Sequence, residues 1–225
     1  MSRPRPRRHR VWQGAVVALA AALVLALTQN TTTAAFTAQT SDDGNSTTAA
    51  ADFCSAPGRV DTLTTGTVDA GLYQSQPTTN YASTATFGTI SSAGALARSL
   101  IKFPLLSKPS GCVVASAVLT MRVSNGTAGS TIQVYRAAAA WNVATVTWNT
   151  DPGYVAGTVA TAAAAVNGTV VTWNVAALVT ALYAGPDNGF LIKDAAEGVG
   201  SVTQLYDSSD AVTVANRPKL VITWG

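Results

Sequence analysis

Three aromatic residues lie in segments where an exposed ring could stack on the carbon–hydrogen face of a sugar. Tyr81 stands in the segment TTNYAS and Tyr154 in DPGYVA, which are both polar and rich in turn-forming residues, while Trp141 follows a run of alanines. Aromatic rings bury a large apolar area, and neutral polar side chains beside them match hydroxyl groups. Tyr81, Tyr154 and Trp141 are therefore candidate ligand-binding residues, with ordinary packing of each ring as the alternative.

The residue types that most catalytic mechanisms need are missing from the body of the chain. The single histidine, His9, lies near the N-terminus, so the rest has no imidazole for a general base, a Ser–His–Asp system or a zinc site. Glu197 is the only glutamate, so a carboxylate pair for glycoside hydrolysis would need an aspartate such as Asp207 or Asp210. Those two stand in YDSSD, a composition typical of a turn. We expect no enzymatic activity and assign no catalytic residue.

No motif with the spacing of metal ligands is present. The EF-hand loop pattern is absent, and the two cysteines have no zinc-type spacing. We predict no cofactor, and leave open a structural calcium ion held by aspartate side chains and backbone carbonyls.

The formal net charge of +3 comes from the N-terminus. Five of the 14 Lys and Arg residues lie in the first ten positions, which leaves nine against 11 acidic residues from Phe36 onward. Nucleic-acid binding needs clustered basic side chains that displace counterions. We therefore expect no nucleic-acid partner.

Residues 1–35 have the layout of a signal peptide. A basic stretch precedes Ala15–Leu27, thirteen uninterrupted apolar residues, whereas a membrane span needs about 20. We predict cleavage between Ala35 and Phe36, a secreted protein, and membrane contact only through this segment before cleavage. An uncleaved anchor is the alternative.

Cys54 and Cys112 are the only cysteines. In the oxidising compartment that a signal peptide implies, we expect them to form a disulfide. Closing a loop of that length stabilises a fold by about 4 kcal/mol in the chain-entropy model. Two separate buried thiols are the alternative.

From about residue 60 the chain reads as short strands separated by turns. In Ala117–Val123, apolar side chains alternate with Thr120 and Arg122, which is the pattern of a strand with one buried face. Further strands are predicted at Thr67–Tyr73, Ala85–Ser91, Ser99–Leu105, Ile132–Arg136, Val170–Trp173, Gly189–Lys193, Val202–Asp207 and Lys219–Trp224. Many short strands predict an all-β domain over 60–225, a β-sandwich or jelly roll of antiparallel strands, after an extended segment at 36–59.

One short helix is expected within this domain. Val175, Leu178, Val179 and Leu182 follow the spacing of one apolar helical face, between a capping Asn174 and a terminating Gly185. The alanine-rich stretches Ala137–Ala140 and Thr161–Ala165 are compatible with a helix but too short to stand alone. Asn125-Gly126 and Asn167-Gly168 predict turns with positive φ.

The tetrapeptide VTWN occurs at Val146–Asn149 and at Val171–Asn174, and VITWG ends the chain. In a strand, the valine and the tryptophan share one face and the threonine lies on the other. An indole on the valine face lies in the core, where it buries roughly 200 Å². We predict core positions for Trp148 and Trp173, with ligand contact as the alternative.

Read in order, these segments resemble the DNRLRE-type domain, a β-sandwich module of secreted bacterial proteins related to carbohydrate-binding modules. The matching pieces, which cover nearly all of residues 60–225, are PTTNYAS, ARSLIKFPL, PSGCVVASAVLTMRV, IQVYRAAAAWNVATVTWNTDP, VTWNVAALVTALYAG, GFLIKD and NRPKLVITW. Two positions depart from the pattern: Asn142-Val143 replaces an acidic residue, and Ala82 replaces a glycine. The resemblance implies the fold, an extracellular setting and, by association, carbohydrate binding.

Residues 34–50, AAFTAQTSDDGNSTTAA, resemble the N-terminus of camelysin-like and biofilm-matrix surface proteins. That resemblance implies export from a Gram-positive-type cell. Two functions remain: a secreted, non-catalytic module that binds glycan or cell-wall polysaccharide, or a structural surface or biofilm-matrix protein without a glycan ligand. Attachment to the cell surface and the oligomeric state stay open.

Overall fold

A computed structural model describes residues 53–225, which form eleven β-strands, one α-helix and two short 3-10 helices. The predicted all-β class with one helix is confirmed. The predicted signal peptide and the bond between Ala35 and Phe36 lie outside the described residues, as does most of the 36–59 segment. In the part of the chain that is described, no helix is long and apolar enough to cross a bilayer.

Four antiparallel strands form the first sheet, in the order β1–β11–β5–β8. Their bounds are Val60–Leu63 for β1, Val114–Gly126 for β5, Val170–Asn174 for β8 and Lys219–Trp224 for β11. The long strand β5 lies in the middle and pairs with β11 on one side and β8 on the other.

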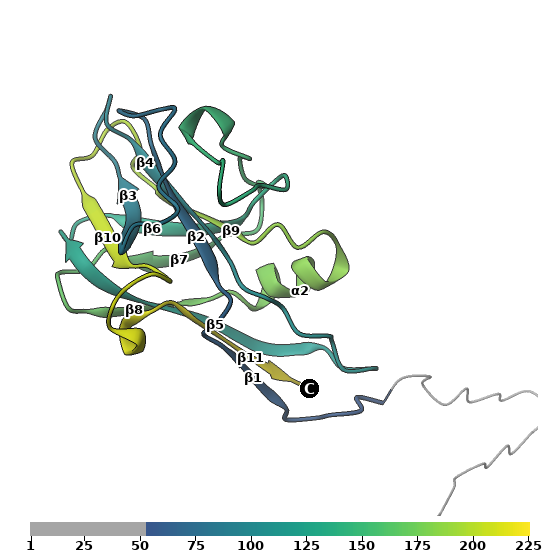
Figure 1. The fold of residues 1–225 in the computed structure, drawn as a ribbon. Coiled ribbons are helices and arrows are strands. Elements are labelled where there is room, and N and C mark those ends of the chain that lie inside the picture. Colours follow the sequence, from purple (N-terminus) through teal and green to yellow (C-terminus); the bar gives the residue numbers. More distant parts are fainter. Residues whose placement is uncertain (1–52) are drawn as a thin grey trace, which may run out of the picture. The chain divides into compact units, whose positions relative to one another are not determined.

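Five antiparallel strands form the second sheet, in the order β2–β4–β9–β6–β7. Their bounds are Val68–Tyr73 for β2, Ala97–Lys102 for β4, Phe190–Asp194 for β9, Thr131–Arg136 for β6 and Ala160–Ala163 for β7. In Figure 1 the second sheet lies above the first sheet, and the long strand β5 of the first sheet runs below it.

Two further strands join the sheets. Strand β3 (Thr86–Ile90) meets β4 at the pair Ile90–Ala97 and pairs along its length with β10 (Thr203–Asp207). Strand β10 then pairs with the C-terminal end of β5, across a register shift between Leu205 and Tyr206. Such a bulge bends a strand, so one curled set of eleven strands surrounds the core.

The main core lies between the two sheets. It is formed by the apolar side chains that alternate with polar ones along the predicted strands. Strand β5 buries Ala117, Leu119, Met121 and Val123, as expected. Trp173 of β8 is 1% exposed, and its ring lies edge-on to Tyr206 with the centroids 5.7 Å apart. The predicted core position of Trp173 is confirmed.

The predicted helix is confirmed as α2 (Ala176–Ala184). The N-cap is Val175, one residue after the predicted Asn174, and it makes no side-chain cap. The Asn174 Oδ1 still accepts a hydrogen bond of 3.1 Å from the backbone N–H of Ala176, the first residue of the helix. Leu178, Val179 and Leu182 are buried in the main core, and Gly185 ends the helix.

Two local predictions are wrong. Asn125-Gly126 is not a turn, because both residues belong to β5 and pair with Leu205 and Gln204 of β10; the turn that follows has its positive φ at Gly129. The first VTWN is not a strand: Trp148–Thr150 form a 3-10 helix, stabilised by a hydrogen bond of 2.9 Å from the Thr147 N–H to the Thr150 hydroxyl. The turn at Asn167-Gly168 is confirmed, with φ of 82° at Gly168.

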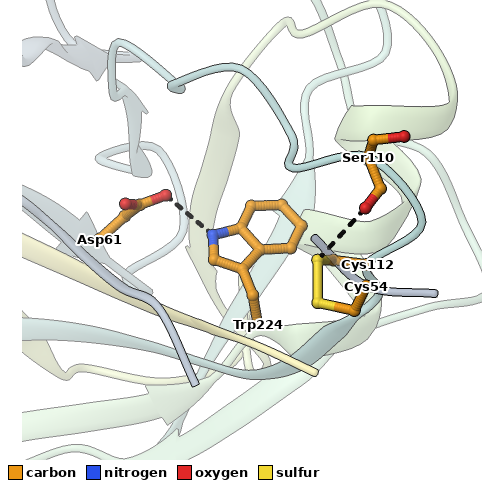
Figure 2. Close-up of a disulfide and its surroundings, with 5 residues drawn as sticks. All are labelled: Cys54, Asp61, Ser110, Cys112 and Trp224. Carbon is orange, nitrogen blue, oxygen red and sulfur yellow. Dashed lines mark hydrogen bonds between the residues drawn. A yellow bond between two sulfur atoms is a disulfide. The ribbon is translucent and has the colours of Figure 1, made fainter. Parts of the chain in front are cut away.

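The disulfide between Cys54 and Cys112 is present. It joins the segment before β1 to the loop before β5, where the Ser55 N–H also donates to the Ser110 carbonyl over 2.9 Å. Figure 2 shows the bond beside Trp224, whose indole N–H donates to Asp61 over 2.8 Å. The Cys112 sulfur lies 3.6 Å from the Ser110 carbonyl oxygen; a disulfide sulfur has no hydrogen to donate, so this is a packing contact.

Replacing both cysteines with serine should destabilise the fold by about 4 kcal/mol, because the unfolded chain regains the freedom of the closed loop. Guanidinium unfolding of the full chain measures this difference. Dithiothreitol should lower the stability of the parent chain and leave that of the double variant unchanged. Equal stability of the oxidised parent and the serine variant would show that the bond does not stabilise the fold.

Candidate ligand-binding site

The outer face of the second sheet carries a small apolar cluster of its own. Ala70, Leu100 and Leu191 lie in register across β2, β4 and β9. Residues 137–156, here called the covering segment, lie over them and contribute Ala137 and Val146 to the cluster. The second sheet is therefore buried on both faces over part of its width.

The covering segment contains two of the tryptophans that the sequence singled out. Trp141 and Trp148 are both half-buried against the small cluster, and not in the main core. The Trp141 indole N–H donates to the Asn188 carbonyl over 2.7 Å. The prediction of a core position for Trp148 therefore holds only in part, because its ring closes a second, shallower layer.

Asn80 anchors the covering segment to the rest of the fold. Its side-chain NH2 donates to the carbonyls of Val143 over 2.9 Å and Val146 over 2.7 Å, and its Oδ1 accepts from the Ala82 N–H over 3.2 Å. Val143 and Val146 lie outside any strand, so their carbonyls are satisfied by this side chain instead of by a strand partner.

Arg98 of β4 holds a second part of the covering segment, and we call this set of contacts the clamp. Its guanidinium donates to both carboxylate oxygens of Glu197, over 2.8 and 2.9 Å, and to Asp151 over 2.8 Å. It also lies 5.3 Å from the ring centroid of Trp148, within the range of a cation–π contact. The two hydrogen bonds to Glu197, together with the one to Asp151, raise the pKa of Arg98 despite its burial.

Lys193 of β9 completes this charge network. Its ammonium lies 3.1 Å from a carboxylate oxygen of Glu197. Burial alone would raise the pKa of Glu197, but the hydrogen bonds from Arg98 and Lys193 outweigh it, so the pKa lies below its usual value. Two cations thus face two carboxylates, and the network has no net charge.

An aromatic pair lies beside the network. The rings of Tyr135 and Tyr154 are 4.5 Å apart at their centroids and tilted by 36°. Lys193 lies 5.6 Å from the Tyr154 centroid, and Tyr154 is 37% exposed. Directly paired residues of antiparallel strands point to the same face, so the pairs Gln133–Lys193 and Gln133–Thr161 place these side chains next to Tyr135. We call Gln133, Tyr135, Tyr154, Thr161 and Lys193 the tyrosine face.

The three candidates chosen from the sequence have different neighbours. Tyr154 lies on the tyrosine face. The Tyr81 ring lies edge-on to Tyr73, 4.7 Å away, and its hydroxyl is hydrogen-bonded to Gln76. Trp141 packs on the small cluster as described above. Sequence reasoning missed Tyr135, although the alternation of Ile132 and Val134 in the predicted strand already places it on the outer face.

Two pockets lie elsewhere. One, of about 410 Å³, opens at the start of β2 between the covering segment and the turn at 208–210; we call it the Asp69 pocket, after its buried carboxylate. Burial raises the pKa of Asp69 to about 6, although hydrogen bonds from Ser209 oppose the change. The other, of about 470 Å³, crosses the outer face of the first sheet and is lined by Arg122, Arg217 and Lys219; we call it the basic groove.

A family model described as carbohydrate-binding module family 96 matches residues 62–224, nearly all of the described domain. This chain belongs to carbohydrate-binding module family 96. No curated protein matches the chain. The matched residues include both sheets, the covering segment and the tyrosine face, so the module is the whole β-domain.

The carboxylates nearest the tyrosine face of this family 96 module are not arranged for hydrolysis. A glycosidase needs a general acid whose pKa is raised, opposite a second free carboxylate. Glu197 has a lowered pKa, and both Glu197 and Asp151 accept hydrogen bonds from Arg98. Their role in this arrangement is to hold Arg98 and, through it, the covering segment.

Glu197→Gln should destabilise the module by about 1–3 kcal/mol at pH 7, because the buried Lys193 and the half-buried Arg98 lose their shared partner. Ionised Glu197 stabilises the fold above its ordinary pKa of 4.5, and this contribution is lost as the pH falls through the lower value of the folded state. The variant should therefore lose less stability than the parent between pH 5 and pH 3 in urea unfolding. Asp207→Asn, which breaks the more exposed pair with Arg122, is the control and should cost less. Parallel pH profiles for the parent and Glu197→Gln would contradict this account.

Proposed function

We propose that this carbohydrate-binding module binds a neutral polysaccharide on the tyrosine face, outside the cell and without catalysing a reaction. The observation that carries the proposal is the exposed ring of Tyr154, which lies on Tyr135 beside an ion-pair network without net charge. Family membership supports a carbohydrate ligand, and the exposed ring of Tyr154 supports this face as its site.

The side chains of the tyrosine face suit a sugar. An exposed tyrosine ring offers an apolar surface to the carbon–hydrogen face of a pyranose. Gln133 and Thr161 add an amide and a hydroxyl, which are uncharged donors and acceptors for sugar hydroxyls. Strand β7, which carries the exposed Thr161, is the last strand of the sheet on this side.

Charge favours a neutral glycan. Arg98 and Lys193 already bind Glu197 and Asp151, so neither cation is left to attract a carboxylate or sulfate group. Moving a ligand anion next to a compensated network would cost desolvation without a new ion pair. A neutral polysaccharide avoids this cost.

An extracellular location is supported by the disulfide and by the N-terminal sequence. Disulfides persist in oxidising environments and are rare in the cytosol, and Cys54 and Cys112 form one. The signal-peptide layout and the camelysin-like segment agree with export. Outside the cell, a cell-wall glycan is the polysaccharide nearest to an exported protein, and we propose it as the ligand. A structural matrix protein without a glycan ligand is the alternative, supported by the camelysin-like segment alone.

Tyr154→Ala should weaken binding of the full chain to a neutral β-glucan at least about tenfold, because the stacking surface is removed; tenfold corresponds to about 1.4 kcal/mol. Affinity electrophoresis in gels that contain the glucan measures this change. Tyr154→Phe keeps the ring and should stay within about twofold of the parent.

Tyr81→Ala is the matched control, because it removes a tyrosine ring that lies away from the tyrosine face. It should leave the retardation of the protein in the glucan gel unchanged. If Tyr81→Ala weakened glucan binding and Tyr154→Ala did not, the binding site would lie at Tyr81 and not on the tyrosine face. Preference for a polyuronate over the neutral glucan would contradict the charge argument, and concentration-dependent assembly without retardation in any glycan gel would favour the matrix alternative.

A further inference from the structure

The Asp69 pocket contains a buried carboxylate without a counter-charge. Asp69 is 1% exposed, and none of the ion pairs among residues 53–225 includes it. Its Oδ2 accepts a hydrogen bond of 2.7 Å from the Ser209 N–H, while its Oδ1 has no partner. A buried carboxylate in this state is costly, because no cation replaces the water that it lost.

A second side chain in the same pocket is also unpartnered. Thr67 is only 9% exposed, and its hydroxyl makes no hydrogen bond with any described residue. Thr67 lies two residues before Asp69, and alternation along an extended chain turns both side chains to one side. Both line the pocket. The two residues that line the pocket thus each carry a buried oxygen atom that nothing in the described domain satisfies.

The turn at 208–210 brings a second carboxylate to the pocket. The Ser208 hydroxyl donates to the Thr84 carbonyl over 2.6 Å and accepts from the Asp210 N–H over 3.0 Å. This holds Asp210 at the mouth of the pocket, where its negative charge adds to that of Asp69. Two like charges near each other repel unless a cation lies between them.

We propose that the Asp69 pocket binds a calcium ion, with side-chain oxygens supplied by Asp69, Thr67 and Asp210. The ion would compensate the buried carboxylate, turn the repulsion between the two aspartates into attraction, and occupy the free lone pairs of Oδ1 and the Thr67 hydroxyl. Water and backbone carbonyls complete the six to eight oxygen ligands that calcium takes.

The donor set selects calcium over other metals. All three side chains offer oxygen, and the described residues contain no group of three or more His, Cys, Asp or Glu side chains, so a soft or borderline metal finds no suitable site there. Magnesium requires a near-ideal octahedron, whereas calcium accepts an irregular mixture of hydroxyl, carboxylate and water. With two carboxylates, the affinity should lie in the range of extracellular modules, a Kd on the order of 10⁻⁴–10⁻³ M.

Thermal unfolding of the full chain tests the site. We expect 5 mM CaCl2 to raise the Tm by about 2–8 °C over the value in EDTA, as binding to the folded state alone requires. MgCl2 at the same concentration, and NaCl at matched ionic strength, should raise it much less. Asp69→Asn should abolish the calcium shift while its Tm in EDTA stays at or above that of the parent, because an amide can satisfy Ser209 and Thr67 without a charge.

Three further variants keep the test sharp. Asp210→Asn lies at the exposed mouth and should reduce the calcium shift without affecting the fold. Val143→Asp adds a third carboxylate to the pocket wall and should enlarge the shift. Asp207→Asn removes the same charge from the same segment but does not line the pocket, and should keep the full shift.

No calcium-specific shift in the parent, or an equal shift in Asp69→Asn, would overturn the proposal. The two proposals can be tested independently. Tyr154→Ala should keep the calcium-dependent rise in Tm, and Asp69→Asn should keep its retardation in the glucan gel. Loss of glucan retardation in Asp69→Asn, with no calcium shift in the parent, would mean that the pocket holds a sugar and no metal.

Discussion

Arg98 holds a segment of twenty residues with little regular structure against the outer face of a β-sheet. Its guanidinium is bound to Glu197 from the loop before β10 and to Asp151 from the covering segment, and it packs over Trp148. Planar, bidentate pairing of this kind fixes orientation as well as distance. Asp151 lies three residues before Tyr154, whose backbone is also held by a bridge to Ala137, so the clamp and this bridge together position the ring.

The clamp also explains why the tyrosine face is both ordered and uncharged. Covering Ala70, Leu100 and Leu191 gives the covering segment an apolar floor, and Asn80 satisfies its carbonyls at the other end. What remains at the open edge of the sheet is a tyrosine pair with neutral polar neighbours. The charged side chains that position these rings neutralise one another in ion pairs. A site that contains Arg98 and Lys193 can therefore favour a ligand without charge.

Local signals in the sequence predicted most of the fold and little of the site. Nine of the eleven described strands and α2 follow from patterns that span a few residues, whereas β1 is not predicted and β7 lies in the alanine-rich stretch that is compatible with a helix. The failures are non-local: Asn125-Gly126 is a strand because β10 pairs with it, and the two VTWN copies differ because Val171–Asn174 lies beside β5 while Val146–Asn149 has no strand partner. Tyr154 could be found from its polar context, but the bond between Arg98 and Glu197 joins residues 99 positions apart, and no short pattern records it.

The central claim is that the module holds a neutral glycan on the tyrosine face, and amide chemical-shift mapping of the full chain during titration with a soluble neutral oligosaccharide tests it most directly. The account predicts saturable shifts centred on Gln133, Tyr135, Tyr154, Thr161 and Lys193, with the first sheet unaffected. Shifts centred on Arg122, Arg217 and Lys219 of the basic groove, with the tyrosine face unmoved, would contradict it.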